Sequence, residues 1–553
     1  MFPFVLLLIA SFLFPIAASP LNRGISIPSG DPNKILCQLP ILKRILCPRT
    51  SSSAITKNTP LGIASGVLDP DGAYRFSVKY ASAARWQPST IVTNWVLPNG
   101  ATNSSALPLA CPQDVLDPSA YSEDCLSMVL YVPPSLTVTS NAPTFVWIHG
   151  GSFIIGSATG PGLDGSKLAI ATDSIVAVIQ YRLGVLGYMA PNGQTNLALK
   201  DTVNALRFLN TVVPSFGGSS SKITIAGQSS GASAIRALLA APSASSLFRS
   251  AVLQSDPMNF GLLGTTTQTT LLNYFTQSLG CGTDAACLNA LSLDTIISAQ
   301  EDLSGAAYGL DPAAGLSEPI RPVLDGTFLT SPLDSTAPFP AVSKHLLVTT
   351  VLNEAGPAIY GGNRDPLPEE AFPQACEFTF GEDRTEVIVN SPFYPAVPSL
   401  DGSVDSRVQL QILGTDYLWR CSSWTFSRNW VQHGGIAYVG QYVVGATYPG
   451  NDQVPYCTEA GVICHQDDIE IVFGTVQNPT SPQAALTTEM QKRYKAFLNT
   501  GNPNVAGVPT WTAAGTSDVH PILLGGSGEV GVGACVPSFW GQNATYDYQV
   551  FNQ

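Results

Sequence analysis

The chain has 553 residues, a formal net charge of −13 and only 12% charged residues, with 49 glycines and 43 prolines. Its acidic balance argues against nucleic acid and anionic membranes as partners. The glycine and proline content predicts long, weakly charged loops, and no linker or internal repeat divides the chain, so residues 59–553 are expected to form a single domain.

The amino terminus has the features of a secretory signal. Residues 1–19 carry no charge and contain the apolar run Phe4–Phe14, followed by small residues that end at Ser19. This pattern predicts a cleaved signal peptide and therefore a secreted, extracellular protein. An uncleaved anchor is disfavoured because the run is short and interrupted by Pro15, and no later segment is apolar for long enough to cross a bilayer, so stable membrane insertion is not expected. Residues 20–58 are predicted to form an irregular extension.

Eleven cysteines behind a signal peptide predict an oxidising destination and several disulfides. Proximity in the sequence favours three local pairs, and a fourth with less support: Cys111–Cys125, Cys281–Cys287, Cys457–Cys464 and then Cys37–Cys47. Three cysteines cannot be paired from the sequence: Cys376, Cys421 and Cys535. Because the total is odd, at least one thiol is free or pairs with another chain. Asn103 and Asn543 begin N-glycosylation sequons, as in a eukaryotic secreted protein.

Along the rest of the chain, apolar runs alternate with helix-like stretches. Five runs have the continuous apolar character of buried parallel strands: Thr144–Ile148, Ile175–Gln180, Ile223–Ala226, Ala251–Gln254 and Leu346–Leu352. Between the second and third runs, apolar residues recur at helical spacing over Leu199–Val213. This alternation predicts an α/β fold with a doubly wound, mostly parallel sheet and helices on both faces. In such sheets ligands bind outside the carboxyl ends of the strands.

The most specific motif follows the third strand-like run. It reads Gly227-Gln228-Ser229-Ser230-Gly231, it occurs once in the chain, and helix-forming residues follow it. G-x-S-x-G between a strand and a helix is typical of the nucleophile elbow of an α/β-hydrolase. Glycines are expected there because side chains flanking Ser229 would collide with the tight turn. The turn would present the Ser229 hydroxyl at the carboxyl edge of the sheet, with the start of a helix facing a developing oxyanion.

A serine nucleophile needs a base, which in this fold follows it in the chain after an acid. His433, His465 and His520 come late enough. His465 is favoured because it directly follows Cys464, and a bridge from that residue would fix its approach. His433 is otherwise expected at a turn or strand end, and His520 in a surface loop.

The acid and the oxyanion donors are expected at the ends of two other strands. Glu354 lies just beyond the run Leu346–Leu352, where a carboxylate could reach the histidine. Its main competitor, Asp325, is followed by glycine and is interpreted as an Asp-Gly turn; other carboxylates are expected to be solvated. The oxyanion hole would combine the N–H of Ser230 with the glycine turn His149–Ser152, in which His149 is expected to be structural.

With these residues in place, the chain resembles the type-B carboxylesterase family, which includes cholinesterases and fungal lipases. Further stretches carry the match: Ser122–Pro133, Phe216–Gly218, Gln254–Ser255, Val472–Gly474 and Thr500–Asn504. The resemblance runs from Thr59 to Trp511 and implies the α/β-hydrolase fold with no metal or organic cofactor. It also implies the roles of the site residues: Ser229 as nucleophile, Glu354 as acid, His465 as base, Gly151, Ser152 and Ser230 as oxyanion donors, and Ser255 as a support of the triad.

The chain departs from the family pattern at three positions around the elbow. The family usually has Glu before the nucleophile and Ala after it, where this chain has Gln228 and Ser230, and a third glycine where this chain has Ser152. Since the oxyanion donors are backbone N–H groups, both serines can still serve. Gln228 removes a charge and is expected to change stability more than chemistry.

These features predict a secreted serine carboxylic ester hydrolase that acts on a small-molecule or lipid ester through an acyl-enzyme. The Cys111–Cys125 loop encloses only thirteen residues, whereas family lipases carry a long lid there, which favours short-chain or soluble esters. The alternatives are a triacylglycerol lipase of the same family and a non-catalytic binding or adhesion protein on the same fold. The pocket walls are expected from the insertions 261–316 and 365–408. The acyl and alcohol preference and the oligomeric state stay open.

Overall fold

The computed structural model describes residues 55–282, 284–334, 338–398 and 402–540. The predicted signal peptide, most of the predicted extension, Cys37, Cys47 and the Asn543 sequon lie outside these residues. Residues Ile55–Thr59 form strand β1, which pairs antiparallel with β2. The end of the predicted extension therefore already belongs to the sheet.

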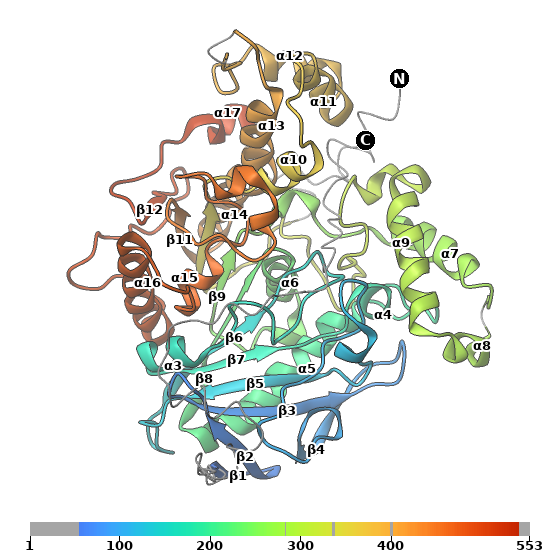
Figure 1. Ribbon diagram of the computed structural model, residues 1–553, viewed down its shortest axis with the longest axis vertical. Helices are drawn as coiled ribbons and strands as arrows, with labels where there is room; N and C mark the ends of the chain where they lie inside the picture. Colours follow the sequence, from blue (N-terminus) through green and yellow to red (C-terminus); the bar gives the residue numbers. More distant parts are fainter. Residues whose placement is uncertain (1–54, 283, 335–337, 399–401, 541–553) are drawn as a thin grey trace, which may run out of the picture.

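A twelve-stranded sheet runs through the described part of the chain (Figure 1). The strands follow the order β1-β2-β3-β5-β7-β6-β8-β9-β10-β11-β12, and β4 pairs with β3. Neighbours from β7 to β12 are parallel, while those from β1 to β7 are antiparallel. The remaining strands are β2 (Gly62–Leu68), β3 (Tyr74–Ser82), β4 (Thr90–Val96), β5 (Ser127–Val132), β6 (Ala142–Ile148), β7 (Ile175–Ile179), β8 (Gly218–Gln228), β9 (Ser250–Gln254), β10 (His345–Val351), β11 (Ile436–Tyr442) and β12 (Ile522–Leu524).

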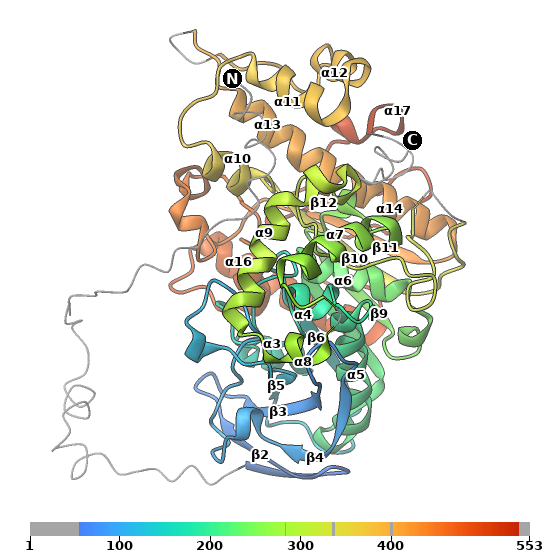
Figure 2. The same cartoon turned by 90° about the vertical axis from the view of Figure 1, so that its right-hand side faces the viewer.

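The α-helices lie on both faces of this sheet and beyond its carboxyl edge (Figures 1 and 2). They are α3 (Ser166–Thr172), α4 (Gly184–Tyr188), α5 (Leu197–Val212), α6 (Ser230–Leu239), α7 (Thr265–Ser278), α8 (Ala285–Ala290), α9 (Leu293–Leu310), α10 (Gly356–Gly362), α11 (Ala371–Phe380), α12 (Glu382–Val389), α13 (Ser406–Gly414), α14 (Cys421–Gln432), α15 (Ile469–Phe473), α16 (Ser481–Thr500) and α17 (Pro537–Trp540). Within the described residues, no helix is both long enough and apolar enough to cross a membrane.

Strand β6 shows why the sheet carries helices on both faces. All seven of its residues are buried. Phe145 and Trp147 point into the core formed with α3 and α16, while Val146 and Ile148 point into the core formed with α5 and α6. Because side chains alternate across a strand, only a strand apolar at every position can be buried on both faces. The predicted doubly wound, mostly parallel sheet is confirmed.

The five predicted strands correspond to β6, β7, β8, β9 and β10, and the predicted helices correspond to α5 and α6. A third apolar cluster, centred on α10, α11 and α13, lies at the opposite end of the molecule from β1–β4 (Figure 2). The β6–β10 block therefore lies between a β-rich end and a helical end, and its carboxyl edge carries the candidate site.

Candidate active site

Ser229 stands at the junction between β8 and α6, in a strained backbone conformation. Its φ is 58° and its ψ is −132°, a combination that non-glycine residues seldom adopt and that clusters at functional sites. The turn passes so close to β6 that a side chain at Gly231 would place its Cβ 2.2 Å from the Ile148 carbonyl oxygen. The Ser229 N–H donates to the Gln254 carbonyl at 2.9 Å. The motif thus has the strand–turn–helix context expected of an elbow.

Glu354 and His465 meet although they are far apart in the chain. Glu354 follows β10, is 1% exposed, and its Oε2 lies 2.6 Å from Nδ1 of His465. Its Oε1 accepts a hydrogen bond from the Val351 N–H at 2.8 Å, which fixes the carboxylate. Burial lowers the pKa of His465, but the hydrogen bond and charge of Glu354 outweigh it, so the pKa is raised. In this geometry Glu354 orients the imidazole ring of His465 and stabilises its protonated form.

The loop that carries His465 is attached directly to the loop that carries Glu354. The Asn353 N–H donates to the Ile463 carbonyl at 2.8 Å, and the Ile463 N–H donates to Asn353 Oδ1 at 3.0 Å. The predicted Cys457–Cys464 disulfide is present and closes the loop before the histidine. These contacts fix the positions of Glu354 and His465 relative to each other.

The other ring nitrogen of His465 contacts Gln228, the residue before Ser229. Gln228 Nε2 lies 3.0 Å from His465 Nε2, while Gln228 Oε1 is buried and has no hydrogen-bond partner in the described part of the chain. The amide donates, so Nε2 of His465 is the acceptor and its proton stays on Nδ1, facing Glu354. Sequence reasoning assigned Gln228 mainly to stability, whereas the structure places it on the candidate base.

The predicted oxyanion turn lies beside the elbow and is held by hydrogen bonds. Gly151, Ser152 and Phe153 all have positive φ, at 116°, 51° and 64°. The Phe153 N–H donates to Ser230 Oγ at 3.1 Å, so the serine that departs from the family pattern ties the turn to α6. No hydrogen bond among the described residues uses the N–H of Gly151 or Ser152. Ser230 begins α6, where an N–H has no intrahelical acceptor.

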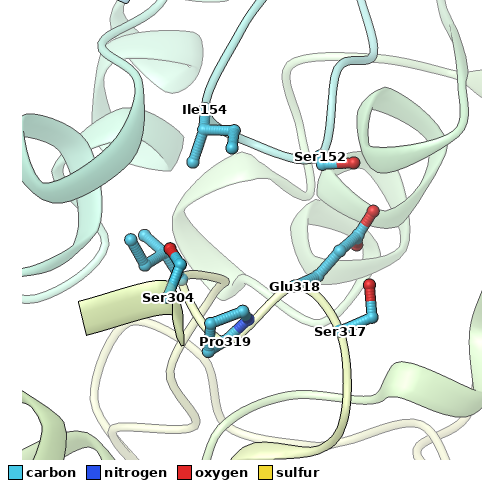
Figure 3. Close-up of a pocket in the computed structure, with 7 residues that line it drawn as sticks. Ser152, Ile154, Ser304, Ser317, Glu318 and Pro319 are labelled. Carbon is cyan, nitrogen blue, oxygen red and sulfur yellow. The ribbon is translucent and has the colours of Figure 1, made fainter. Parts of the chain in front are cut away.

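The second departure, Ser152, also has a partner. Its hydroxyl interacts with the carboxyl of Glu318, a residue that was not predicted, and this interaction partly offsets the rise in pKa that burial causes. Figure 3 shows the Glu318 side chain pointing toward Ser152 at the edge of a small recess. The recess is lined by Ser152, Ile154, Ser304, Ser317, Glu318, Pro319 and Ile320. No motif marks Glu318 in the sequence, because only the fold brings the loop before Pro319 against the turn after β6.

The expectation that other carboxylates are solvated is wrong for several of them, and three of these have a pKa that is raised to about 7. Glu318, Asp467 and Asp468 are 8%, 2% and 0% exposed, and burial raises the pKa of each to about 7. Asp467 accepts from the N–H groups of Tyr448 and Cys464, and Asp468 accepts from the Gln254 amide. The sequence did carry a signal for the two aspartates, because both follow His465 within three residues.

The competing residues lie in structural settings. Asp325 accepts from the N–H groups of the turn that follows it, as predicted. His149 stacks on Tyr181, and burial lowers its pKa to about 4, so it is neutral. His433 caps the end of α14, and His520 is half-buried near Asp518.

Ser255 is not brought into the network in the predicted way. Its Oγ is buried and has no hydrogen-bond partner among the described residues, so no hydroxyl contact with Glu354 or His465 supports a role beside the triad. Its N–H donates to the Thr349 carbonyl of β10 at 2.7 Å. The residue therefore links β9 to β10 through its backbone.

The disulfides extend the predicted set. Cys111–Cys125, Cys281–Cys287 and Cys457–Cys464 are present as predicted. Cys421 pairs with Cys535, which joins α14 to the segment before α17, and Cys376 is a buried free thiol. The Cys111–Cys125 loop is held down by Gln113, which exchanges two hydrogen bonds with the backbone of Gly156, both at 2.9 Å. It therefore packs against the body of the protein just beyond the oxyanion turn.

Known proteins resemble this chain in sequence and in fold. The sequence profile of the carboxylesterase family matches residues 61–528. The cAMP-regulated D2 protein of Dictyostelium discoideum is 28% identical over 499 residues, which cover 87% of this chain and 90% of the relative. Para-nitrobenzyl esterase of Bacillus subtilis is 27% identical, covering 73% and 81%, and carboxylesterase 1D of Rattus norvegicus is 26% identical, covering 77% and 80%. A solved PNB esterase structure aligns with a TM-score of 0.66 at 24% identity, over 85% of this chain and 96% of that one.

Proposed function

The chain belongs to the carboxylesterase family and is a carboxylic ester hydrolase, and from this premise we propose that it is a secreted serine esterase with a Ser229–Glu354–His465 triad. The observation that carries the triad is the 2.6 Å contact between Glu354 Oε2 and His465 Nδ1, beside a serine held in the strained turn of an elbow. Secretion is supported by the apolar segment Phe4–Phe14 and by the disulfides of the described chain. Asn103, which is exposed, is the proposed glycosylation site in this region.

In the proposed reaction, Ser229 Oγ attacks the ester carbonyl carbon while its proton passes to Nε2 of His465. For this step the Gln228 amide releases Nε2, which then accepts a hydrogen bond from the Ser229 hydroxyl. Glu354 stabilises the imidazolium, and the N–H groups of Gly151, Ser152 and Ser230 donate hydrogen bonds to the negatively charged carbonyl oxygen. His465 then protonates the leaving alcohol. Water, deprotonated by the same histidine, cleaves the acyl-enzyme and releases the acid.

Short-chain or soluble esters are the proposed substrates. The loop between Cys111 and Cys125 is short and is fastened by Gln113 to the backbone of Gly156, so it does not offer the long lid of a lipase. The recess next to the oxyanion turn is also small and partly polar. Both features favour a compact ester over a long acyl chain.

The test is hydrolysis of p-nitrophenyl esters from acetate to palmitate by the wild type and by Ser229→Ala and Glu354→Gln. We expect activity to peak at short chains, to fall by at least ~10³-fold in Ser229→Ala, and to fall strongly in Glu354→Gln, because a triad acts as a unit. Activity that rises toward palmitate would favour a lipase. Activity unchanged in Ser229→Ala would remove the proposed nucleophile, and no activity on any ester would favour a binding role.

A further inference from the structure

Glu318 is held in place beside the candidate oxyanion turn by its own loop. Its backbone has a φ of 51°, which is unusual for a residue that is not glycine and precedes a proline. Arg321 Nη1 donates to the carbonyls of Glu318 and Ala314, at 3.0 and 2.6 Å, and so keeps the loop folded. Strained residues that persist in this way cluster at functional sites.

The Glu318 carboxyl is incompletely satisfied. It interacts with the Ser152 hydroxyl, while its Oε2 is buried and has no hydrogen-bond partner among the described residues. A buried acceptor without a partner is unfavourable, because it has lost its hydrogen bonds to water. Because the side chain borders the recess (Figure 3), a rotation of the carboxyl would let a bound ligand with a donor group satisfy this oxygen.

The groups that face the carboxyl decide which kind of donor fits. Arg321 brings positive charge toward it, His465 does so once it is protonated, Asp256 brings negative charge, and Ser152 brings a hydroxyl. A substrate ammonium group would have to approach Arg321, and also His465 when it takes up the serine proton, whereas a hydroxyl would bring no charge toward them. Ser304 and Ser317 add further hydroxyls to a lining that is otherwise largely apolar, so the recess suits a compact group that carries a single hydroxyl.

We propose that Glu318 is a specificity-determining residue that selects esters with a hydroxyl group near the ester carbonyl, by accepting a hydrogen bond from that hydroxyl at Oε2. This inference rests on the proposed function, because it assumes that the ester carbonyl lies at the Gly151–Ser152 turn. An ester that lacks the hydroxyl leaves the carboxyl unsatisfied. When the carboxyl is ionised, its charge also opposes the oxyanion that forms beside it.

Matched ester pairs test the proposal. The acyl arm compares p-nitrophenyl 3-hydroxybutyrate with p-nitrophenyl butyrate, and the alcohol arm compares 2-hydroxyethyl butyrate with ethyl butyrate. In the wild type we expect kcat/KM for the hydroxylated member to be at least about 10-fold higher in one arm, which identifies the side of the ester that enters the recess; the factor corresponds to one hydrogen bond. In Glu318→Leu the preference should disappear, while Glu529→Gln, at an exposed carboxylate, should keep it.

A second variant covers the case in which Glu318→Leu does not fold. Since the pKa of Glu318 is raised to about 7 by burial, the preference for the hydroxylated ester should grow between pH 6 and 8 in the wild type. Glu318→Gln cannot ionise and should show a constant ratio. The ratio between two substrates cancels the titration of His465, which both share.

The outcomes separate this proposal from the proposed function. If the wild type hydrolyses plain esters and Ser229→Ala does not, the serine esterase stands, and equal rates within both pairs overturn the role of Glu318. A preference that survives in Glu318→Leu, or a pH-dependent ratio that survives in Glu318→Gln, also overturns it. If no ester is hydrolysed, the proposed function fails and the inference falls with it.

Discussion

At the candidate base, a glutamine amide occupies the position that a serine hydroxyl must take during catalysis. Gln228 Nε2 lies 3.0 Å from His465 Nε2, on the side of the ring opposite Glu354. A neutral amide leaves Glu354 as the charged group that is hydrogen-bonded to the ring, and Asp468 and Glu318 add smaller effects. The residue before the nucleophile therefore sets the charge environment of the base, which is a chemical role.

A carboxylate at this position should change the pH dependence. In Gln228→Glu, a second negative charge within about 3 Å of the imidazolium should raise the pKa of His465 further, because opposite charges at this distance shift a pKa by about 1–3. The acid limb of the kcat/KM profile with p-nitrophenyl butyrate should move to higher pH by about one unit or more. Gln228→Leu, which removes the donor without adding charge, is the control and should not move the limb upward. An unmoved limb in Gln228→Glu would mean that the contact has no influence on the base.

Residue identities in the site were predictable to the extent that motifs carry them. Ser229, Glu354 and His465 were selected from a motif, a strand end and a disulfide neighbour, and the structure brings Glu354 and His465 together. Glu318 could not be selected, because its importance lies in a contact with Ser152 that depends on the path of a loop between elements. Buried carboxylates in general are invisible to residue type alone, since the same side chain is usually solvated.

At the scale of elements, the sequence rule that succeeded was the continuous apolar run. It finds strands buried on both faces, such as β6 and β7, in which every residue is buried. It does not find β4, where exposed and half-buried residues fill the strand. The antiparallel end of the sheet, from β1 to β5, was therefore not predicted in detail, although it does not contribute to the site.

The loop between Cys457 and Cys464 offers a prediction about an element and its function. The Cys457→Ser/Cys464→Ser double variant should lose about 2 kcal/mol of unfolding free energy, the expected effect of opening a loop of this length. It should also lose about 10-fold or more in kcat/KM, because His465 directly follows the bridge and small displacements of catalytic groups are costly.

The Cys281→Ser/Cys287→Ser variant is a matched control for that loss. The two cysteines of this bridge are separated by 6 positions, compared with 7 for the bridge before His465, and Cys287 belongs to α8, which lies at the outer edge of the molecule (Figure 1). Urea unfolding should give a similar destabilisation for both variants, whereas kcat/KM should fall in the first alone. Equal activity in the two variants would show that the bridge does not position the histidine.

At the scale of the whole molecule, the parallel block explains how distant segments meet. The oxyanion turn follows β6, the elbow follows β8 and Glu354 follows β10, and these strands are parallel and lie close together in one sheet. Their carboxyl ends share an edge, so the sequence order of strands was sufficient to expect a common site. The helices α7–α13 arise from long insertions, and their packing depends on contacts that no periodic pattern encodes.

The buried carboxyls give the whole protein an unusual dependence of stability on pH. Burial raises the pKa of Glu318, Asp467 and Asp468 to about 7, so between about pH 5 and 7 each is neutral when folded and ionised when unfolded. The folded state then binds more protons than the unfolded state, and stability falls as pH rises, by about 1.4 kcal/mol per pH unit for each group. His149, whose pKa is lowered to about 4, acts in the opposite sense, but it is one group against three.

We therefore expect the free energy of unfolding, measured in urea, to decrease by several kcal/mol from pH 5 to pH 7. In Asp468→Asn, an amide oxygen can still accept from Gln254, and the slope should become shallower by about 1.4 kcal/mol per pH unit. Asp452→Asn changes an exposed carboxylate and should leave the slope unchanged. Carboxyls with a lowered pKa, such as Asp405, lose their contribution only below their usual range and so do not act in this window. A stability that increases from pH 5 to pH 7 would mean that these carboxyls are ionised in the folded protein, and with them Glu318 at the site.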